Sequence, residues 1–149
     1  MAGTLVTDRL EASSAAQLVI ENGVANTPPT IVDLNGTEVG TLCRAWVSFN
    51  GSGTVAIRSS FNVSSITDHA TGEYTVNMTN AMPDANYSVS AQAQSPGTAA
   101  ITICMFGYYT AGPTLTKIDP TTSTFRFICS ITAAPYAADP LFVTASVFR

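Results

Sequence analysis

The sequence predicts an all-β protein, an antiparallel β-sandwich or jelly-roll-like knob preceded by a short extended segment. The first observation is an alternation of apolar and polar residues with a period of two, which is typical of strands with one buried face. The second is the placement of Gly, Pro, Asn and Asp, which separate the alternating stretches at the spacing of a sandwich or barrel. Together they predict a sandwich of about seven strands, which lies after residue 40.

Residues 1–40 form the first predicted unit, an anchor or stem with a linker. It contains two short apolar patches, Leu5-Val6 and Leu18-Val19-Ile20. Pro28-Pro29 excludes regular helix and central strand, which predicts an extended linker, and Asn35-Gly36 predicts a tight turn. So few apolar side chains cannot bury a core alone. We therefore expect this segment to pack on the second unit, on copies of itself or on a larger assembly.

The stretch Arg9–Glu21 is compatible with two local structures. Its alanines and glutamates permit a helix. Its short apolar patches suit strands better, with a turn at Ser13-Ser14 between strands around Thr4–Leu10 and Gln17–Glu21. We favour the strands.

Residues 41–149 form the second predicted unit, the β-sandwich knob. Its strands are expected at Cys43–Phe49, Thr54–Arg58, Glu73–Thr79, Asn86–Gln94, Ala100–Tyr109, Ser123–Ile131 and Leu141–Phe148. The turns between them are expected at Asn50–Gly53, Asp68–Gly72, Met82–Asp84, Ser95–Gly97 and Ala111–Pro113. The last strand carries apolar residues on both faces, which predicts that it is buried on both sides or lies at a subunit contact.

The chain carries little charge. Charged residues make up 11% of it, and six Lys and Arg against ten Asp and Glu give a net charge of −4, whereas soluble domains have roughly 25% charged residues. So few basic residues exclude nucleic-acid binding as a main task. No apolar run reaches the roughly 18 residues of a membrane span, so no membrane insertion is expected. Residues 85–116 contain no charge, which predicts two core strands with neutral loops or a surface against another subunit.

No motif predicts catalysis, a metal site or a cofactor, so we expect the protein not to be an enzyme. The single histidine, His69, is expected in a polar turn without a nucleophile elbow. Most carboxylates lie in turn-like contexts, and phosphate-binding glycine motifs and calcium loops are absent. The cysteines Cys43, Cys104 and Cys129 lack the spacing of a metal site. We expect them to be reduced core residues, with a Cys104–Cys129 disulfide as the alternative.

Aromatic residues are the best candidates for contacts with a receptor. Tyr108, Tyr109 and Tyr136 are flanked by Gly, Ala or Pro near predicted strand ends. His69 is a further candidate, for contact with a glycan or an ion. Trp46 is expected on the more polar face of its strand, where it either stacks on a sugar or packs beneath the N-terminal segment or a neighbouring subunit. We favour packing for Trp46.

A longer pattern supports a resemblance to a known family. It consists of Leu42–Arg58, Ser60–Asp68, Gly72–Asn77 and Ala81–Tyr87. This pattern resembles the C-terminal β-module of bacteriophage tail-fibre-like and other virion appendage proteins, many of them from marine and cyanobacterial phages. The similarity extends weakly to Val143–Arg149. The resemblance implies a homotrimeric, non-enzymatic protein on the tail or capsid surface of a virion, assembled in the host cytoplasm, and it transfers no catalytic residues.

The expected function is that of a short tail-fibre-like receptor-binding protein, which attaches a phage to its host. The implied partners are copies of the chain itself, other virion proteins contacted through the N-terminal segment, and a host surface glycan or protein. Only residues 1–40 precede the module, which argues against a long fibre. The alternative is a capsid decoration or head-fibre protein anchored by residues 1–40.

Overall fold

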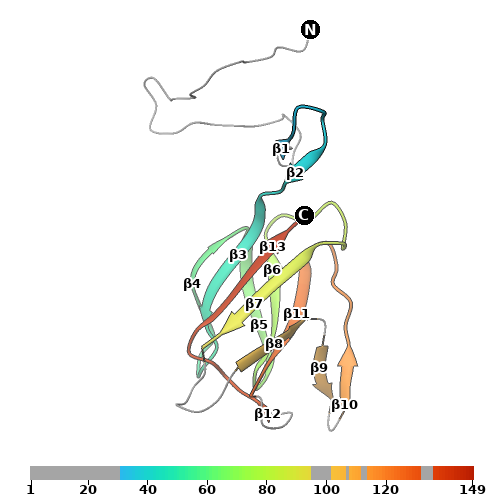
Figure 1. Cartoon of the computed structure of the whole chain (residues 1–149). Coiled ribbons are helices and arrows are strands. Elements are labelled where there is room, and N and C mark those ends of the chain that lie inside the picture. Colours follow the sequence, from blue (N-terminus) through green and yellow to red (C-terminus); the bar gives the residue numbers. More distant parts are fainter. Residues whose placement is uncertain (1–30, 95–101, 107, 112–113, 132–135) are drawn as a thin grey trace, which may run out of the picture.

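A computed structural model describes residues 31–94, 102–106, 108–111, 114–131 and 136–149. Within these ranges all regular elements are strands, and every pairing between them is antiparallel. The predicted all-β sandwich is therefore confirmed (Figure 1). In chain order the strands are β1 (Ile31–Val32), β2 (Glu38–Gly40), β3 (Cys43–Asn50), β4 (Ala56–Phe61), β5 (Val63–Ala70), β6 (Glu73–Met78), β7 (Ser88–Ala93), β8 (Thr102–Phe106), β9 (Tyr108–Ala111), β10 (Thr114–Lys117), β11 (Thr124–Ile131), β12 (Tyr136–Ala137) and β13 (Val143–Phe148).

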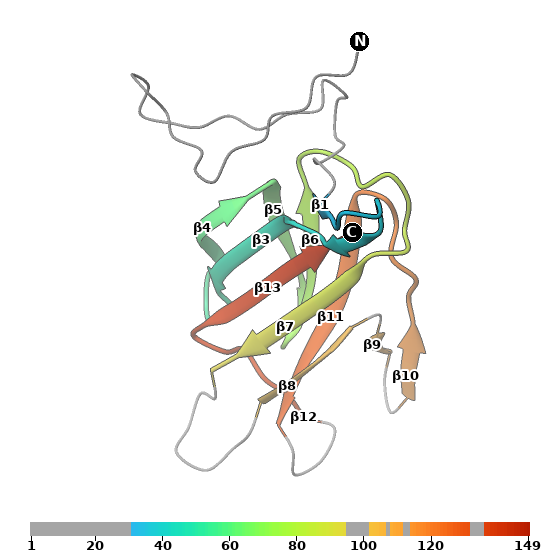
Figure 2. The ribbon, with the colours of Figure 1, turned by 45° about the horizontal axis from the view of Figure 1, so that its top comes forward.

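Two sheets form the sandwich. The four-stranded sheet has the order β4-β3-β13-β7, and the five-stranded sheet contains β5, β6, β11, β12 and β8. In the five-stranded sheet, β6 and β12 lie along one side of β11 and β8 lies along the other, because Ser130 pairs with both Ala137 and Ile103. The strands β1 and β2 form a separate hairpin, as do β9 and β10 (Figure 2).

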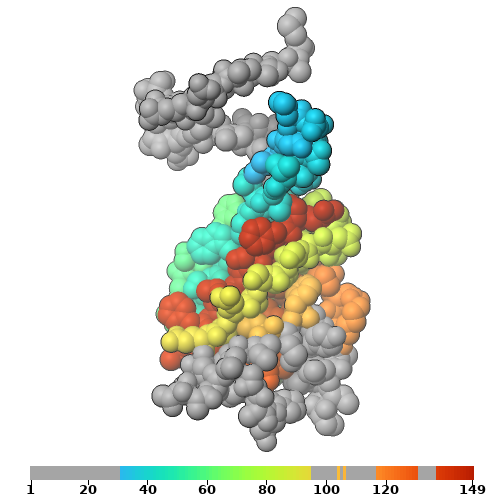
Figure 3. All heavy atoms as spheres, in the orientation of Figure 1, coloured from blue at the N-terminus to red at the C-terminus, as the bar shows by residue number. Residues whose placement is uncertain are grey.

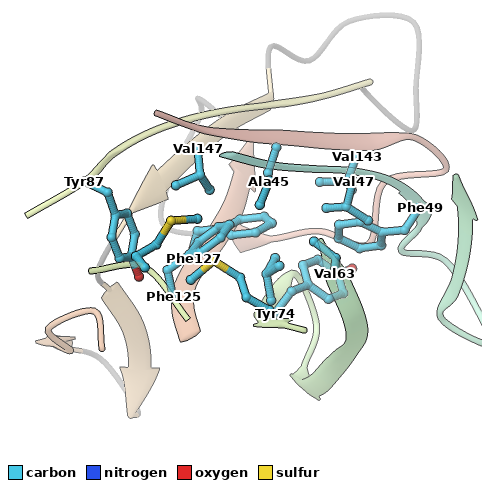
Figure 4. Packing of buried hydrophobic residues seen from close by; sticks show 14 of the residues in the cluster. Ala45, Val47, Phe49, Val63, Tyr74, Tyr87, Phe125, Phe127, Val143 and Val147 are labelled. Carbon is cyan, nitrogen blue, oxygen red and sulfur yellow. The ribbon is translucent and has the colours of Figure 1, made fainter. Parts of the chain in front are cut away.

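The core lies between the inward faces of the two sheets. The Phe49 ring meets the Tyr74 ring edge to face with 5.1 Å between centroids, and the Phe127 ring lies 6.0 Å from that of Tyr74 (Figure 4). Such aromatic pairs contribute more to the stability of a core than the burial of their surface area alone. The alternation predicted for these strands is confirmed, since the inward residues are all at most 6% exposed: Ala45, Val47, Phe49, Tyr74, Val76, Met78, Phe125, Phe127, Cys129, Val143, Ala145 and Val147.

A single residue, Asn62, leads the chain from one sheet to the other. It separates β4 from β5 and has a φ of 54°, in the left-handed region that Asn tolerates better than most residues. Its side-chain amide donates to the carbonyls of Arg44 and Asn80, each at 3.1 Å, and its Oδ1 accepts from the Asn80 N–H at 2.8 Å. These bonds offset the backbone strain at this corner.

The strand β5 is not predicted by the sequence pattern. It lies at the edge of its sheet, and most of its side chains are exposed, with Val63 and Ile66 as the exceptions. A strand with little burial on either face has no reason to alternate. The turn predicted at Asp68–Gly72 is therefore present but shorter, because β5 continues to Ala70 and the turn comprises Thr71-Gly72.

The described part of the neutral stretch 85–116 includes two strands at sheet edges. β7 is the outermost strand of the four-stranded sheet, with no fully buried residue, and β8 pairs with β11 at an edge of the five-stranded sheet. These two edge strands lie side by side. The inward residues of both strands are partly buried and pack against the core, namely Val89, Ala91, Ala93, Cys104 and Phe106. The prediction of two core strands is therefore confirmed for one face of each strand, and contact with another subunit stays a prediction. The single strand expected at Ala100–Tyr109 is instead two strands, β8 and β9.

The last strand, β13, is buried on one face. It runs between β3 and β7, so backbone neighbours flank it on both sides. Val143, Ala145 and Val147 point into the core, whereas Thr144 and Phe148 on the opposite face are exposed. The prediction of burial on both faces is therefore wrong for the single chain, because apolar residues at outward positions do not by themselves bury a face.

The first predicted unit is described only in its last part. Residues 1–30 lie outside the described ranges, and with them the predicted anchor residues Leu5, Val6, Leu18, Val19 and Ile20. The hairpin β1–β2 contains the predicted turn at Asn35-Gly36. Its Asp33 carboxylate accepts the N–H groups of Asn35 and Thr37 at 2.9 Å each, and Gly36 has a φ of 79°. This turn is as predicted.

Gly72 lies in the β5–β6 turn, at a crowded junction between segments. Its N–H donates to Asp139 Oδ1 at 2.6 Å, and its carbonyl accepts the Cys129 N–H at 2.8 Å. Its φ is +71°, and a Cβ at this position would lie 2.5 Å from the Cys129 carbonyl oxygen and 2.7 Å from that of Ala138. Both the conformation and the space therefore require glycine.

We expect the substitution Gly72→Ala to lower the free energy of unfolding by about 3 kcal/mol or more. The strain of a positive φ, roughly 1–2 kcal/mol, adds to the cost of displacing two backbone carbonyls. Gly53→Ala is the matched control, because Gly53 has a φ of +66° and a Cβ there would meet nothing within 4 Å, so only the roughly 1–2 kcal/mol of strain is expected. Urea unfolding compares the two variants, and equal losses would contradict the role of packing at Gly72.

Candidate interaction surface

The outer face of the four-stranded sheet is a continuous surface built by neighbouring strands. Cross-strand pairing builds it in rows, such as the row in which Phe61 lies opposite Trp46, Trp46 opposite Ser146, and Ser146 opposite Ser90. Because the alternate residues of β3 and β13 are buried in the core, these side chains point outward. Figure 3 shows this face, with β13 in red between β3 and β7.

This outer face is aromatic and nearly uncharged. Trp46 is 38% exposed, Phe61 55% and Phe148 38%, and the residues between them are mostly Ser, Thr and Gln. The four strands contain two charged residues, Arg44 and Arg58. Such a composition is typical of the central part of an interface, where charge is depleted and aromatic residues are enriched.

A shallow, open hollow of about 210 Å³ lies on this face, at the end of β7 and the start of β13. It is lined by Gln92, Ala93, Gln94, Phe142 and Thr144. The strand register explains the arrangement, since Thr144 pairs with Gln92 and the Gln94 N–H donates to the Phe142 carbonyl at 2.8 Å. The hollow is therefore held by backbone pairing between two strands.

Arg58 fixes one wall of the hollow. Its guanidinium lies over the Phe142 ring, 3.9 Å from the centroid, and its Nη2 donates to the Leu141 carbonyl at 2.8 Å. A cation over an aromatic face is attracted by the ring quadrupole. These two contacts restrain Phe142 at the rim although it is 42% exposed.

The chemistry of the hollow suits an uncharged ligand rich in hydroxyl groups. Gln amides and the Thr hydroxyl both donate and accept hydrogen bonds, and a sugar hydroxyl also does both. The Phe142 ring supplies an apolar surface beside them. An open, shallow shape fits a glycan chain that passes over the surface better than a small molecule that must be enclosed.

For the tyrosines predicted to bind a receptor, the structure describes the position of the backbone. Tyr108 and Tyr109 lie in β9, where they pair with Lys117 and Thr116, and Tyr136 lies in β12. The side chains of Tyr108 and Tyr109 are outside the described part of the structure, as is that of Tyr136. Figure 1 shows β9, β10 and β12 at the end of the sandwich opposite the hairpin β1–β2.

His69 lies in β5, not in the predicted turn, and its ring is exposed. Its Nε2 is 2.9 Å from Thr75 Oγ1 on the neighbouring strand. Partial burial lowers the pKa of His69 below its ordinary value of 6.5, and the positive charge of Arg126 lowers it further, while the carboxylates of Glu73 and Asp68 oppose the shift. The structure therefore favours a neutral His69.

A buried ion pair near His69 is a feature that the sequence analysis missed. Arg126 Nη2 donates to Glu73 Oε2 at 2.8 Å, and the Glu73 side chain is 2% exposed. A charged pair with this little exposure depends on close hydrogen bonding, because desolvation of both charges is costly. Glu73 stands two positions from the Thr75 partner of His69, so the pair and the histidine belong to one polar cluster on the five-stranded sheet.

Trp46 occupies the outward face of β3, as the alternation predicts. Packing of Trp46 beneath the N-terminal segment or a neighbouring subunit stays a prediction. The hollow was not predicted, although the alternation of β7 already places Gln92 and Gln94 on one face. The missing information is that β7 and β13 are neighbours, which brings Thr144 beside Gln92.

Comparisons with known proteins found no relative of this chain. No protein-family model, no curated protein and no solved structure matches the chain. The resemblance to phage appendage modules therefore depends on the sequence pattern alone. Among the described residues, no helix is long and apolar enough to cross a membrane, and no three His, Cys, Asp or Glu side chains are grouped as metal ligands.

We expect His69 to titrate with a midpoint below pH 6.5 in an NMR titration of the folded protein, because burial and Arg126 disfavour its charged form. The chain has one histidine, so its ring signals need no assignment. The unfolded chain then binds the proton more tightly than the folded one. The stabilising contribution of neutral His69 is therefore complete above the unfolded pKa and is lost as the pH falls through the folded pKa.

The control is the same titration in a denaturing concentration of urea, where the midpoint should return to about 6.5. A folded midpoint at or above the unfolded one would contradict the prediction. It would mean that the carboxylates of Glu73 and Asp68 outweigh burial and Arg126.

Proposed function

We propose that this chain is a virion surface protein of a bacteriophage that attaches the particle to its host, in the manner of a short tail fibre. The proposal starts from the resemblance of residues 42–94 to tail-fibre-like modules. The single structural observation that supports it best is the two-ended layout of the described chain, with the hairpin β1–β2 that follows residues 1–30 at one end and β9, β10 and β12 at the other (Figure 1).

The end of the sandwich that carries the hairpin β1–β2 is the proximal end, and several contacts join the chain segments there. The hairpin β1–β2 leads into β3, and the Thr41 hydroxyl donates to the Arg149 carbonyl at 2.9 Å. The Arg149 guanidinium binds both carboxylate oxygens of Asp84, at 3.0 and 2.6 Å. The C-terminus and the start of β3 are thus joined at the same end. This layout suits a knob whose attachment to the particle and whose contact surface are separated in space.

The hollow on the four-stranded sheet supplies a candidate contact for a neutral glycan. It offers two Gln amides, the Thr144 hydroxyl and the Phe142 ring on a surface with almost no charge. One such shallow site binds weakly. We include in the proposal the homotrimer that the resemblance implies, because three linked sites raise the apparent affinity through effective concentration.

Immunogold labelling of intact phage particles with antibody against this protein tests the location. Gold at the tail or baseplate is the expected result for a protein that attaches the particle to its host. Gold distributed over the head would overturn the tail-fibre proposal. That result would favour the alternative, a capsid decoration or head-fibre protein anchored by residues 1–40.

Adhesion to host cells tests the hollow. We expect the double variant Gln92→Ala, Thr144→Ala to lose at least about fivefold in cell binding, because each lost hydrogen bond costs about 0.5–1.5 kcal/mol and 1.4 kcal/mol is tenfold. The matched control is Ser59→Ala, because Ser59 lies in the same cross-strand row of the same sheet, opposite Ser48, at the far edge from Gln92.

Saturable binding of the fluorescently labelled full chain to host cells is the measurement. Loss in the double variant with full binding by the control would support the hollow as the receptor contact. Equal binding by both variants would exclude the hollow and direct attention to the end of the sandwich that carries β9 and β12.

A further inference from the structure

Cys104 and Cys129 face each other across two paired strands. The register of β8 and β11 places them directly opposite one another, and their Sγ atoms are 3.2 Å apart. Both are free thiols in the structure. Their separation in sequence, 25 positions, gives no indication of this contact, which depends on the pairing of an edge strand with a central one.

The backbone around Cys129 shows which kind of pair this is. Its N–H donates to the Gly72 carbonyl at 2.8 Å, and its carbonyl accepts the Ala138 N–H at 3.0 Å. Both groups therefore point toward the β6 and β12 side of β11, away from β8. Cys104 and Cys129 are consequently a non-hydrogen-bonded pair, in which the Cα atoms approach to about 4.5 Å. That separation lies within the range that a disulfide spans.

The two thiols differ in environment. Cys129 is fully buried, whereas Cys104 is partly exposed. The two sulfur atoms are within hydrogen-bond distance of each other, and this interaction lowers the pKa of Cys104, whereas together with burial it raises the pKa of Cys129. The thiolate is the reactive form of cysteine. Cys104 is therefore the thiol that reacts first, and Cys129 lies within reach of the product.

We propose that Cys104 and Cys129 are a modification site, which a low-molecular-weight disulfide such as oxidised glutathione converts into an intramolecular disulfide. The Cys104 thiolate attacks one sulfur of the oxidant, so that a mixed disulfide forms and one glutathione thiolate leaves. Cys129 then loses its proton and attacks the Cys104 sulfur, and the second glutathione leaves. Two protein thiols are oxidised, and one glutathione disulfide is reduced to two glutathiones.

The disulfide would close a loop that contains the β9–β10 hairpin. β8 lies before the hairpin and β11 after it, so the bond joins the two strands from which the hairpin extends. Closing a loop removes conformational freedom from the unfolded chain and stabilises the fold. Thiols stay reduced in a cytosol and oxidise outside cells. A bond made on release from the cell is a consequence that rests on the proposed virion function; the disulfide itself does not.

The test uses the full chain, purified with its thiols reduced and then incubated with oxidised glutathione. Trypsin releases the three cysteines on separate peptides, residues 10–44, 59–117 and 127–149. The expected result under non-reducing conditions is a link between peptides 59–117 and 127–149, with Cys43 still free. The Cys43→Ser variant is the matched control and should form the same link.

A second measurement keeps the proposal testable if a cysteine variant folds poorly. We expect the thermal midpoint of Cys43→Ser to rise by about 10 °C on oxidation, from the stabilisation typical of a loop of this length. Cys104→Ser should show neither the link nor the rise. A persistent glutathione adduct at Cys104, a link to Cys43, or an unchanged thiol content would each overturn the proposal, whether or not the protein attaches to host cells.

Discussion

The hydrogen bonds around Asp139 connect segments that are distant in the sequence. Its Oδ1 accepts the Gly72 N–H at 2.6 Å and lies 3.0 Å from the Tyr74 hydroxyl, which lies 2.9 Å from the Gly51 carbonyl. Gly51 in turn donates its N–H to the Pro140 carbonyl at 2.9 Å. Burial raises the pKa of Tyr74, so its hydroxyl remains a donor. The β3–β4 loop of one sheet is thereby joined to the β5–β6 turn of the other.

This junction closes one end of the sandwich, and the aromatic core depends on it. The Tyr74 ring contacts Phe49 of the opposite sheet and Phe127 of its own sheet (Figure 4). The Tyr74 hydroxyl has hydrogen-bond partners at the end of the core. Its ring can therefore be buried without leaving a buried polar group unpaired. Because the core is built from the inward residues alone, the outward residues of the four-stranded sheet remain exposed, and they include Trp46, Phe61 and residues that line the hollow.

The scarcity of charge gives this protein a different surface from that of most soluble domains. With 11% charged residues, the polar side chains are mostly Ser, Thr, Asn and Gln, and several of the charged side chains are paired. Arg149 binds Asp84 at the proximal end, and Arg126 binds Glu73 in the polar cluster that includes His69. A neutral hydrogen-bonding surface of this kind suits contact with other neutral polar surfaces, and it keeps long-range electrostatic steering weak.

The sequence alone determined which residues face the core in the central strands. Alternation predicts the buried sets of β3, β6 and β11, because a strand with one buried face must repeat with a period of two. It did not predict β5, whose edge position buries little, or the contact between Gln92 and Thr144, and it offered the pairing of Cys104 with Cys129 only as an alternative. Only the tertiary structure decided these, because backbone hydrogen bonds join neighbouring strands and carry no side-chain pattern that identifies the partner strand.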